Sequence, residues 1–337
     1  GTFTTDPAPI VHRFDGYVDE WPVEWPTGGE TEATSNVTAL DLQSRIGRMR
    51  TLGSVIAETY ALDSPIWHFP LGESSESTSA GDIRGTGGTL KVAQYGTGGE
   101  LTFGAGTGPG TDGSGAPSFA PVDTSNGLYL QGSTATRPNF ATGQTLAATV
   151  NTSTVGAAQT VARWSDDWGT ALAVGTDSTG RATATFADSW APANNRTVTS
   201  ASIYADGRTH HIAATIQNTA GTHTMRLYVD GVERGSAGTW SAGGAFTYAF
   251  NLLRVGGAYF PRNLFTGTIS HVAAFGTALS GATLLEHHAA NSDGFAGETS
   301  DERIERVWSW LGMPAELLAL DAGAATMGHI DPTGRDS

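Results

Sequence analysis

The chain has 337 residues, of which 45 are glycine and 15% are charged, and its formal net charge is −15 at pH 7. An acidic surface repels phosphate backbones and anionic lipids, so the charge argues against nucleic acid and membrane surfaces as partners. Cysteine is absent, which rules out disulfide scaffolds, thiolate zinc sites and cysteine nucleophiles. Apolar runs stay well short of a membrane span, so no membrane insertion is expected.

Residues 1–61 are expected to form a small N-terminal segment of strands and short helices. Residues 13–21 alternate between apolar and polar types, which indicates a strand, and Pro22 ends it. Further along, Ser54 is a favoured N-cap residue and stands directly before residues 55–60, which we predict to be helical.

Residues 62–292 have the pattern of an all-β domain. Short alternating runs are separated by glycine-rich turns, which favours a two-sheet sandwich over a helical bundle. The glycine-rich residues 104–115 are expected to be a long loop, and residues 279–290 a closing helix. The predicted strands are 127–131, 145–150, 159–164, 171–174, 182–186, 197–203, 211–216, 224–229, 252–255 and 267–275.

The clearest local signal is a hairpin near the middle of this domain. Apolar residues alternate with Arg226 and Tyr228 along the run that precedes Asp230 and Gly231. An Asp-Gly pair readily supplies the two positive-φ residues of a tight two-residue hairpin. We therefore predict that the strand turns at Asp230 and Gly231.

Residues 293–337 are predicted to form a C-terminal helix and a tail. Thr299 and Glu302 have the spacing of a capping box, and Gly312 with Pro314 would end the helix near residue 311. An isolated helix of this length is marginal in water, so its apolar stripe needs a partner surface. The stripe contains Ile304, Val307, Trp308 and Leu311, and the expected partners are Tyr17, Trp21 and Trp25.

Five motifs between about residue 65 and residue 290 resemble laminin G-like domains, which are concanavalin A-like jelly rolls. The motifs are 67–73 (WHFPLGE), 209–215 (THHIAAT), 227–231 (LYVDG), 265–272 (FTGTISHV) and 278–280 (ALS). The family prefers Trp where this chain has Thr209. The resemblance implies a mainly β jelly-roll sandwich flanked by small α+β segments, and a domain that binds surfaces, most often glycans.

The flanks are similar to a different family, the minor tail proteins of bacteriophages that infect actinobacteria. The similar segments are 14–22 (FDGYVDEWP), 37–42 (VTALDL), 45–48 (RIGR) and 315–323 (AELLALDAG). This resemblance implies that the jelly roll is inserted into, or hangs from, a tail-hub protein. It also implies a location in the virion tail, other tail-tip proteins as partners and a homo-oligomeric assembly.

The sequence offers little support for catalysis. Glycoside hydrolases need two carboxylates about 5–9 Å apart, and the strand signature Glu-x-Asp-x-x-Glu is absent from residues 62–292. Adjacent histidines on a helix point about 100° apart, so we expect His287 and His288 to lie on an exposed helix face. His210 and His211 should face opposite sides of one strand and be structural. We therefore expect no enzymatic activity.

The best binding candidate is the loop after the strand 159–164. Aromatic rings stack on the apolar faces of sugars, and carboxylates accept hydrogen bonds from hydroxyl groups. The candidate glycan-binding residues are Trp164, Asp166, Asp167, Trp168, Trp190, Tyr259 and Arg262. Carboxylate oxygens are also ligands for Ca²⁺, which makes Asp166 and Asp167 candidate calcium ligands; no other cofactor is expected. The alternative is that Trp164 belongs to the core and the two aspartates shape a turn.

The leading hypothesis is a non-enzymatic phage tail-tip protein whose jelly roll binds a host cell-surface polysaccharide. Several copies in one particle would convert weak single-site affinity into firm attachment. Two alternatives remain open at this point. The sandwich could be a structural spacer without a glycan site, or the accessory carbohydrate-binding module of a secreted glycan-acting enzyme.

Overall fold

The computed structural model describes residues 52–108, 114–134, 143–166, 169–241, 250–258, 262–318, 320, 322–323 and 325–328, and four short strands before residue 52. The chain divides into two compact units, Gly1–Leu52 and Gly53–Ser337. In the first unit, β1 (Gly16–Glu20) pairs with β4 (Thr38–Asp41), and β2 (Val23–Glu24) pairs with β3 (Thr34–Ser35).

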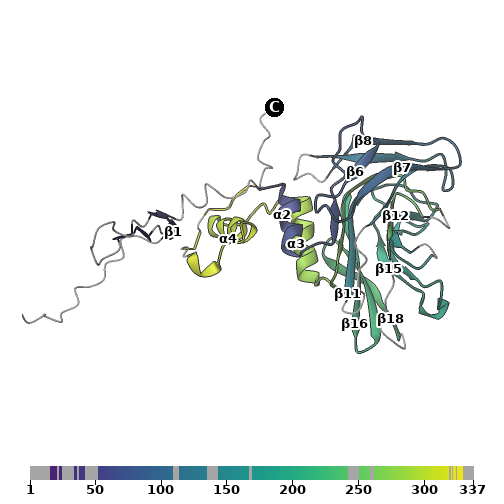
Figure 1. The fold of residues 1–337 in the computed structure, drawn as a ribbon. Helices are drawn as coiled ribbons and strands as arrows, with labels where there is room; N and C mark the ends of the chain where they lie inside the picture. Colours follow the sequence, from purple (N-terminus) through teal and green to yellow (C-terminus); the bar gives the residue numbers. More distant parts are fainter. Residues whose placement is uncertain are drawn as a thin grey trace, which may run out of the picture. The chain divides into compact units, whose positions relative to one another are not determined.

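The second unit is a sandwich of two antiparallel sheets (Figure 1), as the sequence predicts. In spatial order the first sheet contains β15 (Arg196–Ile203), β14 (Arg181–Ala187), β13 (Ala171–Thr176), β12 (Gln159–Ser165), β19 (Leu252–Val255), β10 (Gly127–Ser133), β7 (Thr89–Tyr95) and β6 (Ser79–Gly81). The second sheet contains β18 (Val232–Ser241), β17 (Thr222–Val229), β16 (Thr209–Thr219), β11 (Gly143–Asn151), β20 (Gly267–Phe275), β9 (Gly115–Ala120) and β8 (Glu100–Thr107), and β5 (Trp67–Phe69) pairs with β20.

The core lies between the inner faces of the two sheets. Trp67 from β5 and Trp164 from β12 meet edge to face with ring centroids 5.2 Å apart. The Phe250 ring also meets Trp164, with the ring centroids 5.7 Å apart. These aromatic residues are fully buried, so contacts between the sheets join segments that are far apart in the sequence.

The Asp230–Gly231 hairpin forms as predicted. Val229 pairs with Val232, and both turn residues have positive φ, 53° at Asp230 and 74° at Gly231. Glycine is needed at position 231 for a second reason, because a Cβ atom there would lie 2.4 Å from the Cα atom of Leu285. The tight turn thus allows the closing helix to approach the sheet.

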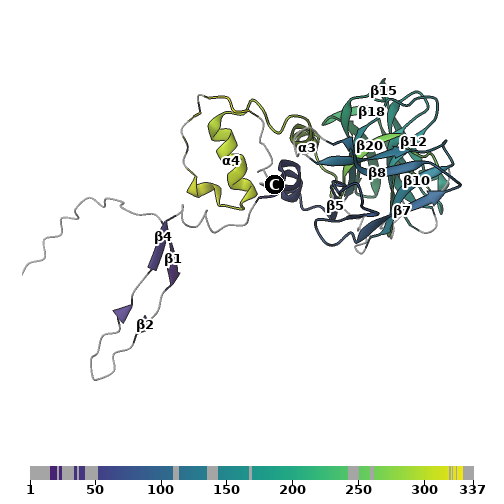
Figure 2. The same cartoon turned by 90° about the horizontal axis from the view of Figure 1, so that it is seen from above.

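Two helices cover the outer face of the second sheet. The helix α2 (Val55–Leu62) has Ser54 as its N-cap, and α3 (Gly281–Ser292) has Ser280. Figures 1 and 2 show the two helices side by side against this sheet. The compact unit therefore begins at Gly53 and includes α2, whereas the sequence led us to place residues up to 61 in the N-terminal segment.

Between these helices and the sheet lies a layer of buried imidazole rings around Tyr60. The Tyr60 ring stacks on His287 at 4.2 Å and lies 4.8 Å from His68. His287 is fully buried, and its Nε2 lies 2.7 Å from Asp63 Oδ2. The expectation of an exposed face at His287 is therefore wrong, since α3 turns this residue towards α2 and the sheet.

The glycine-rich stretch from 104 to 115 is only partly a loop. Residues up to Thr107 belong to β8, and β9 begins at Gly115. The register between these strands shifts between Thr102 and Gly106, and Gly104 has a φ of 65°. This is the signature of a bulge, for which glycine is well suited. Residues 109–113 lie outside the described part of the chain.

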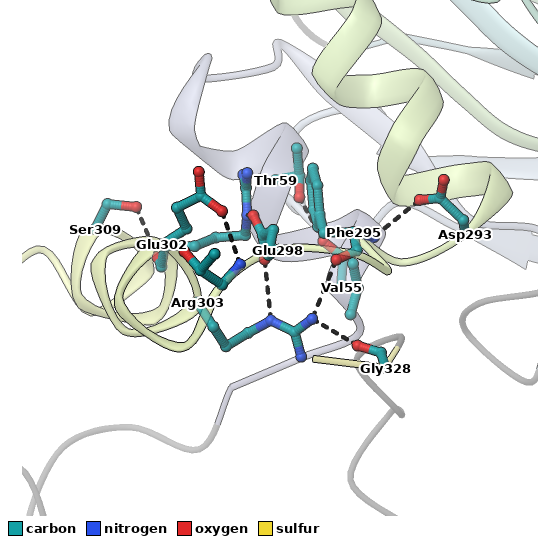
Figure 3. A network of polar contacts seen from close by, with 11 residues as sticks. Val55, Thr59, Asp293, Phe295, Glu298, Glu302, Arg303, Ser309 and Gly328 are labelled. Carbon is teal, nitrogen blue, oxygen red and sulfur yellow. Dashed lines mark hydrogen bonds and ion pairs between the residues drawn. The ribbon is translucent and has the colours of Figure 1, made fainter. Parts of the chain in front are cut away.

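The C-terminal helix α4 (Ser300–Trp310) begins at the predicted cap, where the Thr299 amide donates to Glu302 Oε2 at 2.8 Å. Thr299 also forms an isolated β-bridge with Thr326, so the following segment returns to the start of the helix. Figure 3 shows Arg303 joining these parts: it donates to Glu298 and to the carbonyl oxygens of Phe295 and Gly328.

The apolar stripe of α4 is only partly covered. Trp308 is buried and donates through Nε1 to the carbonyl of Pro314, while Ile304 is 45% exposed. Trp310, which was not in the predicted stripe, is buried near Phe295. The side chains of Tyr17, Trp21 and Trp25 lie outside the described residues, so their predicted contact with this helix stays a prediction.

Candidate functional site

Strand register divides the predicted site residues between two ends of the first sheet. Ser165 pairs with Ala171, and Ala171 pairs with Ala187, so the β12–β13 and β14–β15 loops leave the same end. That end carries Asp166 and Trp190. The other end carries Arg262, because the neighbouring residue Asn263 accepts a hydrogen bond from the Thr160 amide near the start of β12.

Trp164 is a core residue and cannot contact a surface ligand. Its side chain is fully buried, and its Nε1 donates to Thr134 Oγ1 at 3.3 Å. In the register of the sheet it pairs with Leu172 on one side and Leu253 on the other, and both of these are core residues. The assignment of Trp164 to the glycan site is therefore corrected in favour of the core alternative.

Asp166 shapes the β12–β13 loop. Its Oδ1 accepts the amide of Thr170 at 2.8 Å, and its own amide donates to the Thr170 carbonyl at 2.9 Å. Asp167 and Trp168 lie outside the described residues. In the part of the chain that the structure describes, no group of three or more acidic or histidine side chains is arranged to hold a metal, so the calcium site stays a prediction.

Trp190 is an exposed aromatic residue at this end, with 70% of its surface accessible. Its loop is built around the buried carboxylate of Asp188, whose Oδ1 accepts the amides of Trp190 and Ala191, each at 2.9 Å. The second oxygen of Asp188 accepts the Asn194 side-chain amide, also at 2.9 Å. The loop, including the 3-10 turn η1 (Pro192–Asn194), thus presents the Trp190 ring from a fixed backbone.

The Trp190 loop is tied to the neighbouring loop. The hydroxyl groups of Ser189 and Thr170 lie 2.9 Å apart, and Thr170 is itself held by Asp166. Asp166 therefore acts on Trp190 indirectly, through the position of Thr170.

At the opposite end, Arg262 belongs to an aromatic stack. Its guanidinium carbon lies 4.8 Å from the centroid of the Tyr95 ring, and Tyr95 stacks on Tyr129 at 4.4 Å with an interplanar angle of 9°. Arg262 Nη1 also donates to the Ser125 carbonyl at 2.9 Å. Tyr259 lies outside the described residues. Arg262 and Trp190 therefore belong to separate places on the domain.

A hollow of about 250 Å³ opens on the outer face of the first sheet. We call it the threonine hollow, because its lining residues include two threonines from each of β14 and β15, together with small residues from β13. These residues are Thr183, Thr185, Thr197, Thr199, Ala173 and Gly175. Threonine side chains beside small residues provide hydrogen-bonding groups together with room for a ring-sized ligand.

The sequence did carry a signal for this hollow. Along β14 and β15, outward threonines alternate with inward residues such as Ala184 and Val198, which are buried in the core. Two threonines per strand on neighbouring strands place four hydroxyl-bearing side chains on one face. The alternation by itself predicts only a strand.

The carboxylate at the hollow is structural. Among the described residues that line it, Asp177 is the acidic one. Its Oδ1 accepts the amides of Thr179 and Arg181 and the Thr179 hydroxyl, which defines a turn. Burial raises the pKa of Asp177, but the hydrogen bonds from these groups together outweigh it, so the pKa is lowered. Such a group is a poor general acid.

Comparisons with known proteins agree with the architecture. Residues 123–284 match the family model Laminin_G_3, described as Concanavalin A-like lectin/glucanases superfamily. No curated protein matches the chain. None of the helices in the described ranges has both the length and the apolar character needed to cross a membrane.

Two of the similar solved structures illustrate the range of matches. The botulinum neurotoxin serotype D binding domain has a TM-score of 0.45 and 11% identity, over 68% of this chain and 52% of that one. Domain 4 of AbnA, a GH43 extracellular arabinanase from Geobacillus stearothermophilus, solved with arabinotriose, has a TM-score of 0.47 and 14% identity, over 66% of this chain and 98% of that one. The chain thus spans about half the length of the neurotoxin binding domain. Together, the two antiparallel sheets form a jelly-roll sandwich, and residues 123–284 within it are similar to the concanavalin A-like lectin/glucanases superfamily.

Proposed function

We propose that the protein binds glycans without hydrolysing them, through the outer face of the first sheet. The observation that carries this proposal is the exposed Trp190 ring, held by the buried Asp188 at one end of the face that contains the threonine hollow. An exposed aromatic ring fits the apolar face of a sugar, and threonine hydroxyls fit its hydroxyl groups.

The Trp190 loop and the hollow share the strand β14. Trp190 lies three residues beyond Ala187, the last residue of β14, while Thr185 and Thr183 of the same strand line the hollow. Four residues of a strand span about 13 Å. A ligand of a few sugar units could therefore contact the ring at one end and the hydroxyls further along the strand.

The biological setting that we propose is the virion tail of a bacteriophage of actinobacteria. The domain would bind a polysaccharide on the host cell surface, beside other tail-tip proteins and in several copies. The support is the similarity of the flanking segments to minor tail proteins and the capped helix α4, where the chain returns after the jelly roll. Multiple copies would make a weak single site sufficient for attachment.

The test is binding of the purified full chain to actinobacterial cell walls and to an array of defined oligosaccharides. Trp190→Ala should reduce glycan binding roughly tenfold, equivalent to about 1–2 kcal/mol of lost stacking. The matched control is Val232→Ala, which removes another exposed apolar side chain at the start of β18. Unchanged binding by Trp190→Ala would contradict this site.

The same experiment separates the alternative functions. A structural spacer predicts no glycan binding by the wild-type chain at any concentration tested. Release of reducing ends from the walls, abolished by substitution of one carboxylate, would show that the protein is an enzyme and would overturn the non-catalytic proposal.

A further inference from the structure

We infer that acidification releases α2 and α3 from the outer face of the second sheet, because buried histidines between the helices and the sheet take up protons. We call the rings of His68, His211, His271 and His287 the histidine layer. The inference concerns the second sheet and does not depend on glycan binding by the first.

The histidine layer is the contact between the two helices and the sheet. His68, His211 and His271 come from β5, β16 and β20, and His287 comes from α3; each is at most 1% exposed. Tyr60 of α2 lies among them, with its ring centroid 4.2 Å from that of His287, 4.8 Å from His68, 6.3 Å from His211 and 6.4 Å from His271. The helices therefore rest on groups that can become charged.

Two carboxylates stand beside the layer, and both are already engaged. Asp63 of α2 lies 2.7 Å from His287 Nε2. Asp230, in the β17–β18 turn, lies 2.7 Å from His210 Nδ1 and 3.4 Å from His288 Nδ1. Neither bonds to the ring of His211, since both of its nitrogens lack a hydrogen-bond partner in the described chain.

The remaining charged groups around the layer do not compensate for added protons. Arg84, in the loop between β6 and β7, and His288 of α3 are positive or become so in acid. Asp82 accepts the backbone amide of His68 at 2.7 Å. On the helices, Glu58 accepts the amide of Gly53 at 2.6 Å, and Glu286 is exposed.

The closed arrangement fits neutral rings. A neutral imidazole has one N–H and one lone pair, whereas a protonated ring has two N–H groups. His211 has no acceptor for either, and Nδ1 of His287 is buried without a partner among the described residues, so a proton there would add an unsatisfied buried donor. His68 Nε2 and His271 Nδ1 share one hydrogen bond of 3.1 Å, which a proton on the accepting nitrogen would remove.

The direction of the pH effect follows from these surroundings. Burial lowers the pKa of His211 to about 3, the charges of His287 and His288 lower it further, and Asp230 opposes them. Burial also lowers the pKa of His68, as do the nearby positive groups. A histidine in water has a pKa of about 6.5. The open state therefore gains protons, and the closed state loses stability, as the pH falls below about 6.5.

The helices can open without the sandwich. α2 has 8 residues and α3 has 12, so neither is stable alone in water and both depend on the sheet. The core that contains Trp67 and Trp164 lies between the two sheets, on the other side of the second sheet from the helices. α2 begins the compact unit, and α3 leads to α4 (Figure 1). Opening would thus loosen both connections of the jelly roll to its flanks.

Hydrogen exchange of the full chain at pH 7 and pH 5 tests the inference. Rates are expressed as protection factors, which removes the direct effect of pH on amide exchange. His211 alone should favour opening roughly 25-fold over this interval, because its pKa is about 3 when closed and about 6.5 when open. With the other rings, protection of α2 and α3 should fall at least about a hundredfold, while the amides of β12 and β13 remain protected at pH 5.

Two variants with the same substitution make the test specific. His211→Phe should reduce the fall in the protection of α2 and α3 by roughly 25-fold. The control is His223→Phe on β17, where the histidine is also buried but stacks on Trp240 instead of Tyr60; this variant should keep the full fall. Thermal unfolding checks that each variant is folded.

The wild-type chain alone can contradict the inference, so the test does not depend on either variant folding. Equal protection of α2 and α3 at the two pH values would overturn it. Loss of protection in these helices only together with β12 and β13 would also overturn it, because acid would then unfold the whole domain. An unchanged response in folded His211→Phe would show that the layer does not sense the acid.

Discussion

The backbone amide of Trp190 donates a 2.9 Å hydrogen bond to the carboxylate of Asp188. The two side chains have opposite environments, since Asp188 is 1% exposed and Trp190 is 70% exposed. A buried carboxylate that accepts backbone and side-chain amides fixes the loop, so the ring can project into solvent without losing its orientation. The position of the exposed ring therefore depends on a buried residue.

The first prediction concerns this carboxylate. Asp188→Ala would leave the amides of Trp190 and Ala191 without their acceptor, and the free energy of unfolding should fall by about 3 kcal/mol. Asp188→Asn keeps one acceptor oxygen, so its free energy of unfolding should lie between those of Asp188→Ala and the wild type. Urea denaturation measures the change. Trp190→Ala is the control, and its stability should stay within about 0.5 kcal/mol of the wild type; equal stability of Asp188→Ala and Trp190→Ala would contradict the role of Asp188.

The second prediction concerns His210, whose two ring nitrogens face carboxylates. Nδ1 lies 2.7 Å from Asp230 and Nε2 lies 3.1 Å from Asp206, so a protonated ring can donate to a carboxylate from each nitrogen. Burial alone would lower the pKa of His210, but the hydrogen bonds and charges of Asp230 and Asp206 outweigh it and raise the pKa above its ordinary value.

The folded state therefore holds this proton more tightly than the unfolded state. The resulting stabilisation is complete below the ordinary histidine pKa of about 6.5 and is lost as the pH rises through the higher folded-state value. The difference in unfolding free energy between wild type and His210→Gln should shrink as the pH rises from about 6.5 through the raised pKa of the folded state. A difference that is constant over this range would contradict the imidazolium assignment.

The third prediction concerns the neighbouring residue, His211, whose shifted pKa makes stability depend on pH in the opposite direction. It is buried beneath α3, and neither of its ring nitrogens has a hydrogen-bond partner in the described chain. Burial, with the nearby positive charges of His287 and His288, lowers its pKa to about 3. Below the ordinary histidine pKa, His211 binds a proton in the unfolded chain but not in the folded chain.

Stability should therefore fall with acidification below about pH 6.5, by up to about 1.4 kcal/mol for each pH unit from this one group. His211→Phe cannot take up the proton, so its unfolding free energy should depend less steeply on pH between about 6.5 and about 4. The slope is the readout, because the larger ring also changes the packing at all pH values. Parallel slopes for the two proteins would contradict this assignment.

The pair His210 and His211 shows how far sequence reasoning reached. Strand periodicity predicted that they face opposite sides, and their different surroundings agree with this. Periodicity could not supply the partners, however, because Asp206, Asp230 and α3 are brought to the strand by long-range folding. The same limit explains His287, whose burial depends on α2 packing from far upstream.

For the candidate site, too, only the features that depend on local sequence could be predicted. The hairpin, the helix caps and most central strands could be predicted, since each depends on local turn and capping chemistry. The prediction of Trp164 as a glycan contact was wrong, because β12 continues to Ser165 and Ala162, two residues before Trp164, lies in the core with it. The pairing of Arg163 with Arg254 could not be predicted. It depends on β12 and β19 being neighbours in the sheet, and these strands are far apart in the sequence.

The last prediction concerns Glu298, which holds the C-terminal helix. Its carboxylate lies 3.0 Å from Arg303 Nε and 2.6 Å from Arg306 Nε. Arg306 also lies over the ring of Phe295, with its guanidinium carbon 3.4 Å from the centroid. All three charged side chains are mostly buried, so the contacts are worth more than ordinary surface ion pairs.

Glu298→Gln keeps the size of the side chain but removes the charge shared by the two arginines. Local opening of α4 should become easier by about 1–2 kcal/mol, because a helix of this length has little stability of its own. Hydrogen exchange of the α4 amides should accelerate accordingly, while exchange in β12 and β16 stays unchanged. Glu305→Gln removes a charge from an exposed position on the same helix and should leave the exchange rates as in the wild type. Equal exchange in the two variants would show that Glu298 does not anchor the helix.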